Sequence, residues 1–152
     1  MNNRLGPATD CPAAWATAWT AYVDSAVLIS GAAENIVIAN EGRIFRVNPG
    51  DGSWLQICEG TDLSGTSALG AYGPHAFVIS DLHIWQIDVA KGTALELECE
   101  GEWEPPCFMA ANEDGLFNIH NDDLFHVDTE TKQTQRLSHG RDWMNTAYLV
   151  AI

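Results

Sequence analysis

The chain has 152 residues, 46% of them hydrophobic and 18% charged, which is typical of one globular domain. Its net charge is −14, with 7 Lys and Arg against 21 Asp and Glu. So few cations cannot neutralise a row of phosphates, so we expect neither nucleic-acid binding nor attachment to an acidic membrane. Neither a transmembrane run nor a signal-peptide pattern is present in the sequence, so we expect synthesis in the cytoplasm.

The first 24 residues precede a repeated pattern and match it poorly. The Ala-rich run CPAAWATAWTAY, residues 11–22, is the one stretch where we expect a short helix. Everything after this segment is expected to form strands and turns.

From about residue 25 the sequence repeats with a period of 40 residues. Phe45, Trp85 and Phe125 define the phase. Neighbouring positions keep their character in all three units: 44, 84 and 124 are apolar; 47, 87 and 127 are β-branched; 48, 88 and 128 carry short side chains that can bond the backbone of a following turn. A fixed period of this length indicates a repeat architecture.

Each unit predicts four short strands separated by turn residues. In the first unit they cover roughly 26–31, 35–40, 43–48 and 53–58, with GAAEN, NEGR and NPGDG between them. Adjacent apolar positions, such as 44 and 45, indicate a sheet covered on both faces. Four-stranded units of about 40 residues with two covered faces are typical of propeller blades. A β-sandwich is the alternative, but it has no reason to keep a constant period.

We therefore predict an all-β fold with propeller-type blades of four antiparallel strands. Residues 1–24 form an N-terminal segment that could complete the last blade, and residues 25–152 carry the repeats. The expected units are three full blades at about 25–60, 61–100 and 101–140, and a partial fourth at 141–152.

The phrases GRIFRVNPGDGSWLQI and DLFHVDTETKQTQRL resemble the strand–turn–strand phrase of tectonin-type and kelch-type propeller repeats. The likeness extends over about 25–152 as a pattern. The double Gly of kelch repeats is absent, and the Trp of the last strand occurs only at Trp54, with Ala94 and Thr134 in its place later. The resemblance implies a β-propeller and, commonly, a binding role.

The last residues of the chain predict an exposed strand edge. TAYLVAI follows the third unit as the opening strand of a fourth, and an unpaired edge is a ready pairing site. We expect Tyr148, Leu149 and Val150 to form an edge strand used for assembly. A larger ring completed by another chain is favoured over closure by the chain's own N-terminal segment.

The sequence contains no recognisable catalytic motif. The five His are scattered, and no phosphate loop, nucleophile elbow or zinc spacing occurs, so we expect no catalytic residues, metal site or cofactor. Cys99 and Cys107 flank one loop and could bridge, but free thiols are the default without an export signal.

One pair of residues recurs where one blade passes to the next: an acid followed by a bulky side chain. We predict ligand or partner binding by Asp62, Glu102, Trp103, Asp142 and Trp143. An acid beside an aromatic ring suits a sugar or a partner's Lys or Arg. Alternatively, the bulky residue packs between blades and the acid caps the linking turn.

The functional prediction is a non-enzymatic binding or structural subunit of a larger assembly, for example a virion or surface complex. We expect a protein partner or self-association through rigid rims and an open edge. The alternative is a lectin-like propeller that binds carbohydrate or another small ligand.

Overall fold

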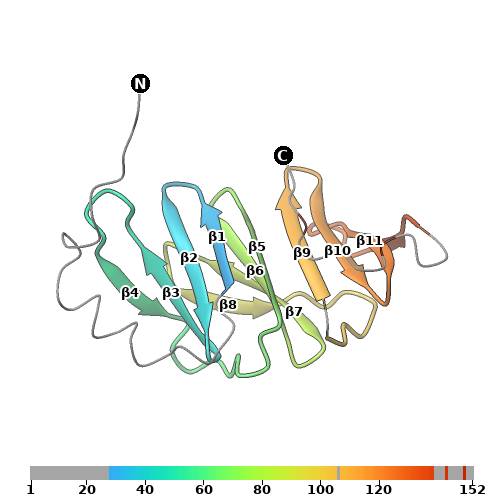
Figure 1. The fold of residues 1–152 in the computed structure, drawn as a ribbon, viewed down its shortest axis with the longest axis horizontal. Helices are drawn as coiled ribbons and strands as arrows, with labels where there is room; N and C mark the ends of the chain where they lie inside the picture. The colour runs from blue at the N-terminus through green and yellow to red at the C-terminus, as the bar shows by residue number, and fades with distance from the viewer. Residues whose placement is uncertain (1–27, 106, 139–142, 144–148, 150–152) are drawn as a thin grey trace.

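The computed structural model describes residues 28–105, 107–138, 143 and 149. These residues form twelve strands in three separate antiparallel sheets, which we call blades 1, 2 and 3 (Figure 1). Blade 1 contains β1 (Leu28–Ala32), β2 (Asn35–Asn40), β3 (Arg43–Val47) and β4 (Trp54–Ile57); blade 2 contains β5 (Ala68–Tyr72), β6 (His75–Ser80), β7 (His83–Asp88) and β8 (Thr93–Glu96); blade 3 contains β9 (Cys107–Asn112), β10 (Gly115–His120), β11 (Asp123–Val127) and β12 (Thr134–Arg136).

The central hairpin of every blade is closed by a two-residue turn at the same repeat position. Both residues of each turn have positive φ: 49° and 71° in the first, 49° and 74° in the second, and 49° and 65° in the third. The turns are Glu41–Gly42, Asp81–Leu82 and Asn121–Asp122. Paired positive φ values match the natural twist of a hairpin, so the turn sets the strand register.

The next turn of each blade is held by a short polar side chain, as predicted. Oδ1 of Asn48 accepts from Gly50 N at 2.8 Å, and Oδ1 of Asp88 accepts from Lys91 N at 2.9 Å. Oδ1 of Asp128 accepts from two backbone amides, at 2.9 and 2.8 Å. These backbone bonds lower the pKa of Asp128, and a hydrogen bond from Lys91 lowers that of Asp88.

One hydrophobic core lies between blades 1 and 2, and a second lies between blades 2 and 3. The first core contains Val37, Ile44 and Val78; the second contains Phe77 and Leu116. Val78 and Phe77 are neighbours on β6 whose side chains point to opposite faces. Blade 2 is therefore covered on both faces, and β5 lies against both β1 and β9 (Figure 1).

Hydrogen bonds also tie the blades together. Nη1 of Arg46 donates to the carbonyl oxygens of Val89 and Ala90 at 3.2 and 3.1 Å. The backbone N–H of Cys58 donates to Gly92 at 2.9 Å. These bonds run from blade 1 to the turn between β7 and β8, so they fix the angle between two blades as well as their separation.

The predicted fold class is confirmed: all described elements are strands, and the three full units are four-stranded antiparallel sheets. Within the described residues the sheets do not close into a ring. The helix predicted at 11–22 and the segment 1–24 lie outside the described residues, as does most of the partial unit at 141–152. No described helix is long and apolar enough to cross a membrane.

Candidate functional site

The predicted blade-to-blade junctions are equivalent in space as well as in sequence. The backbone N–H of Trp103 donates to the carbonyl of Leu82 at 3.1 Å, and that of Trp143 donates to Asp122 at 3.3 Å. At the first junction a Cβ on Gly42 would come within 2.5 Å of the Ser64 Cα, which leaves no room for a side chain. Each central hairpin therefore presses on the junction that follows its blade.

The bulky residues of the three junctions differ sharply in exposure. Leu63 and Trp103 are 1% and 2% exposed, whereas Trp143 is 36% exposed. The Trp103 ring packs edge-on against Phe125 at 5.5 Å and against His120 at 5.9 Å, both from blade 3. The Trp103 ring therefore lies in the core between two blades, which favours the alternative that the bulky junction residue packs between blades, and ligand binding by Trp103 stays a prediction.

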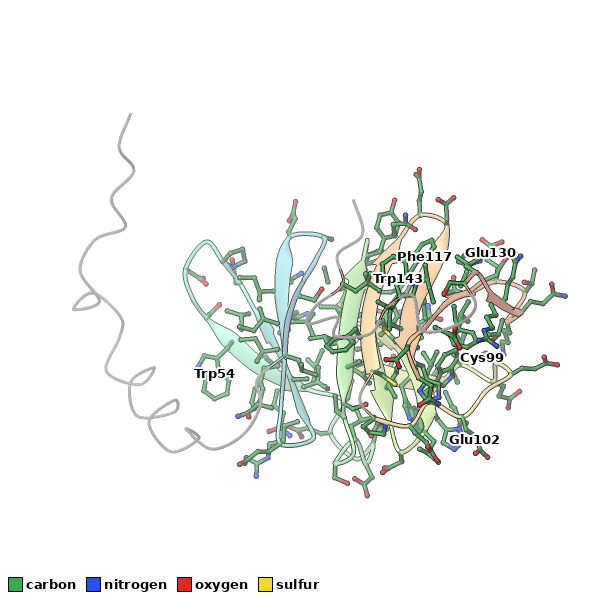
Figure 2. The ribbon with its side chains drawn as sticks, turned by 45° about the vertical axis from the view of Figure 1, so that its right-hand side comes forward. Trp54, Cys99, Glu102, Phe117, Glu130 and Trp143 are labelled. Carbon is green, nitrogen blue, oxygen red and sulfur yellow. The ribbon has the colours of Figure 1, made fainter. Side chains whose placement is uncertain are left out.

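The two described junction acids, Asp62 and Glu102, lie at the surface, and each precedes a bulky residue that is buried. Asp62 is exposed, and its Oδ1 accepts a hydrogen bond from Ser64 N at 3.1 Å. Hydrogen bonds from the side chain of Ser64 and from its backbone N–H lower the pKa of the Asp62 carboxyl. Glu102 is also exposed and points outward from the linker (Figure 2). Asp142 lies outside the described residues. Asp62 therefore caps its turn, and binding by these acids stays a prediction.

Among the described residues, Cys107 and His120 bring a thiol and an imidazole together at one backbone carbonyl, an arrangement that resembles part of a catalytic site. The Cys107 thiol donates to the Glu104 carbonyl at 3.0 Å, and Nδ1 of His120 is 3.0 Å from the same oxygen. Nε2 of His120 is 2.7 Å from Asn121 Nδ2, so a single tautomer, protonated on Nδ1, satisfies both contacts. The cluster anchors the linker on blade 3, and the thiol and imidazole lie 3.6 Å apart.

The described cysteines are free thiols, in agreement with the default expectation. Burial raises the pKa of Cys58 and Cys107 to about 11, and it also raises that of Cys99. A nucleophilic cysteine needs a lowered pKa. The raised pKa of Cys107 therefore fits a thiol that packs in the protein interior and not a nucleophile.

We expect Cys58 and Cys107 to resist alkylation in the folded chain. At about pH 8, a thiol of pKa near 11 is about one part in a thousand thiolate. Iodoacetamide labelling followed by peptide mapping should find both modified only after unfolding. Since the ordinary pKa is 9.0, stability should fall as the pH rises from about 9 to about 11, where only the unfolded thiols ionise. Rapid labelling of the native chain would contradict this assignment.

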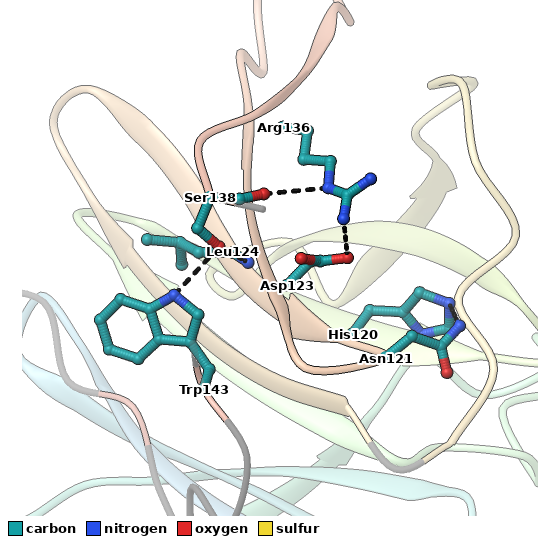
Figure 3. A network of polar contacts seen from close by, with 7 residues as sticks. All are labelled: His120, Asn121, Asp123, Leu124, Arg136, Ser138 and Trp143. Carbon is teal, nitrogen blue, oxygen red and sulfur yellow. Dashed lines mark hydrogen bonds and ion pairs between the residues drawn. The ribbon is translucent and has the colours of Figure 1, made fainter. Parts of the chain in front are cut away.

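Trp143 is held in place by a polar network at the end of blade 3 (Figure 3). Its Nε1 donates to Ser138 Oγ at 3.1 Å, and the same Oγ accepts from Leu124 N at 2.8 Å. Arg136 donates to the Ser138 carbonyl at 2.9 Å and forms an ion pair with Asp123. The indole is thus oriented while much of it remains exposed.

Blade 1 has an apolar face directed away from blade 2, which we call the leading face. The residues of this face occupy repeat positions whose equivalents in blades 2 and 3 face the preceding blade. Ile29 is 64% exposed, whereas its equivalents Leu69 and Met109 are 9% and 6% exposed. Trp54 is exposed on β4, the strand at the opposite edge of this sheet from β1, and lies at the end of the molecule opposite Glu130 (Figure 2). Its ring packs edge-on against that of Phe45 at 5.7 Å.

Blade 3 has the matching apolar face directed away from blade 2, which we call the trailing face. Leu137 is exposed there, although its equivalents Ile57 and Leu97 are buried between blades. Phe117 is half-buried on the same face, and its ring lies 5.1 Å from that of His126. The centres of the two faces, at Ile38, Val47 and Ile119, are already buried. Exposure is therefore concentrated toward the margins of both faces.

The predicted edge strand lies largely outside the described residues. Tyr148 and Val150 are not described, and Leu149 is half-buried and belongs to no strand. Sequence reasoning missed Ile29, Trp54 and Leu137 as candidate contact residues. The repeat phase could have identified Ile29 and Leu137, because their equivalents lie at blade interfaces.

Within residues 28–105, 107–138, 143 and 149, no group of three His, Cys, Asp or Glu side chains is arranged to hold a metal ion. The site features of this region are therefore the two apolar faces, the oriented Trp143 and the exposed junction acids.

No protein-family model matches the sequence, and no characterised protein matches it significantly. Solved structures with propeller-like all-β folds do match in shape. One is PorZ, an essential surface component of the type-IX secretion system of Porphyromonas gingivalis, with 12% identity, a TM-score of 0.56, and coverage of 86% of this chain and 18% of PorZ. Another is apo AztD from Citrobacter koseri, with 12% identity, a TM-score of 0.52, and coverage of 75% of this chain and 48% of AztD. The chain spans less than half the length of either structure, and the likeness shows the fold alone.

Proposed function

We propose that this chain is a non-enzymatic binding or structural subunit, whose three blades form part of a larger propeller assembly such as a virion or surface complex. The observation that carries the proposal is the pair of apolar faces at the two ends of the blade stack. Ile29 on one face and Leu137 on the other are exposed at positions that are buried wherever a neighbouring blade is present.

Ile29 and Trp54 lie on β1 and β4, at opposite edges of the leading face, so the support comes from the repeat positions of the exposed residues and not from a continuous apolar patch. Here the residues are also those that the fold uses for contact between blades. The Cys107–His120 cluster, with its raised thiol pKa, offers less support for catalysis than these faces offer for binding. The likeness to PorZ, a bacterial surface component, is compatible with an assembly role.

Native gel filtration of a tagged chain from its host cells tests this proposal. We expect the tagged chain to elute well above its own mass of 16.6 kDa. Ile29→Glu should shift it toward the single chain, because a buried unpaired charge disrupts an apolar contact. Leu95→Glu is the matched control, since Leu95 is exposed on β8 of the middle blade. A wild-type chain that elutes alone overturns the proposal.

The lectin-like alternative has less support from the junctions. It requires an accessible ring beside an acid, and at the second junction the ring of Trp103 is buried next to the exposed Glu102. At the third junction Trp143 is exposed, but Asp142 lies outside the described residues. Saturable sugar binding by a single chain, lost in Asp62→Asn or Glu102→Gln, would favour this alternative.

A further inference from the structure

We propose that a second copy of this chain covers the two end faces, so that two chains close head to tail into one six-bladed ring. This inference rests on the proposed function and names the partner. The leading face of each copy would dock on the trailing face of the other, and both contacts would form together.

The two end faces are the two halves of an interface that the chain already makes internally. Between blades 1 and 2, Ile44 and Ile57 of the first blade meet Leu69 and Ile87 of the second in one core. On the trailing face of blade 3, Leu124 and Leu137 occupy the repeat positions of Ile44 and Ile57. On the leading face of blade 1, Ile29 and Val47 occupy those of Leu69 and Ile87; Ile29 is exposed, whereas Val47 is already buried within the single chain.

The second internal interface follows the same rule. Ile84 and Leu97 of blade 2 lie in one core with Met109 and Val127 of blade 3. The chain therefore builds the same contact twice with different side chains. Because every copy carries both halves, an identical chain is a sufficient partner, and the contact is heterologous.

The geometry of propellers restricts the number of copies. Propellers typically contain about 4–8 blades. The described residues of each copy form three four-stranded blades. Six is the one multiple of three in that range, so two copies complete the ring.

Trp143 provides a residue-level contact for this arrangement. At the first internal junction Leu63 lies in the same core as Trp85, and at the second Trp103 packs against Phe125. In both cases the two residues are separated by 22 positions in the repeat. Twenty-two positions after Trp143, the next unit would have the residue equivalent to Phe45, Trp85 and Phe125, and in a head-to-tail ring Phe45 of the second copy supplies that residue. The indole of one copy is thus expected to pack on Phe45 of the second copy.

A complementation experiment with purified chains tests the inference. Wild type should show twice 16.6 kDa by light scattering, and more dimer at higher salt because each copy carries a charge of −14. Ile29→Glu and Leu137→Glu should each weaken dimerisation by more than about tenfold. An equimolar mixture of the two variants should recover a 1:1 dimer, since one intact leading face then meets one intact trailing face.

The control variant is Leu95→Glu, which should leave the mass unchanged because Leu95 lies on neither end face. A photo-crosslinking amino acid at position 143 should link two chains, with the product mapped to the region around Phe45. A wild-type chain that stays monomeric at every concentration overturns the inference, as does a mixture that fails to dimerise. If the chain is monomeric when purified yet part of a complex in the host lysate, the second copy is excluded and the proposed function stands.

Discussion

The substitution Trp103→Ala should lower the free energy of unfolding by about 3–5 kcal/mol, the loss expected for a large buried aromatic side chain. The Trp103 ring is 2% exposed and packs edge-on against Phe125 across the blade interface. Its removal leaves a cavity between two sheets, and relaxation of one sheet is resisted by the hydrogen bond from Trp103 N to Leu82. Urea unfolding followed by circular dichroism measures the effect.

Trp143→Ala is the matched control, because it removes the same side chain from the equivalent repeat position. Trp143 is 36% exposed, so its substitution in a single chain should cost less than about 1 kcal/mol. Both variants should carry Ile29→Glu, so that association between chains does not contribute. Equal losses at the two positions would contradict the assignment of Trp103 to the core.

The substitution Asn118→Val should stabilise the chain by about 1–3 kcal/mol, the cost of burying a polar group without hydrogen bonds. Asn118 is fully buried in β10, and neither its Oδ1 nor its Nδ2 has a hydrogen-bond partner among the described residues. Its repeat equivalents are Ile38 and Val78, which are both buried. A β-branched apolar side chain therefore fits this position of the blade.

Asn112→Val is the control for this prediction, since Asn112 is half-buried at the end of β9 and its Oδ1 accepts a hydrogen bond from Asp114 N at 3.0 Å. That substitution should destabilise the chain by about 0.5–1.5 kcal/mol, because it removes a satisfied bond. Unfolding midpoints in urea give both values. A loss of stability in Asn118→Val would show that the buried amide is paired.

Strand positions could be predicted from the sequence because strands and turns depend on residues that are close together in the chain. Asn121 and Asp122 form a turn through their own positive φ values, and Asp88 caps a turn by bonding a backbone amide only three residues away. The 40-residue phase then repeated the same hairpins, and the strands begin and end within about two residues of the predicted bounds in blade 1.

The candidate site could be predicted only in part. The acid–bulky pairs at the junctions were identified correctly as equivalent, and the backbone bonds of Trp103 and Trp143 bear this out. Their roles could not be read from the sequence, because a ring that binds a ligand and a ring that fills a core have the same repeat spacing. Phe125, which helps to define the repeat phase, is only half-buried, whereas Trp103 is in the core.

By itself, the sequence determined that the chain forms three four-stranded units and where each strand and turn lies. Only the tertiary structure decided which repeat positions are buried and which are open. The reason is that hairpin formation is local, whereas burial depends on the sheet that lies opposite. Ile29 and Leu69 carry similar side chains at equivalent positions, and the presence of a preceding blade alone makes one exposed and the other buried.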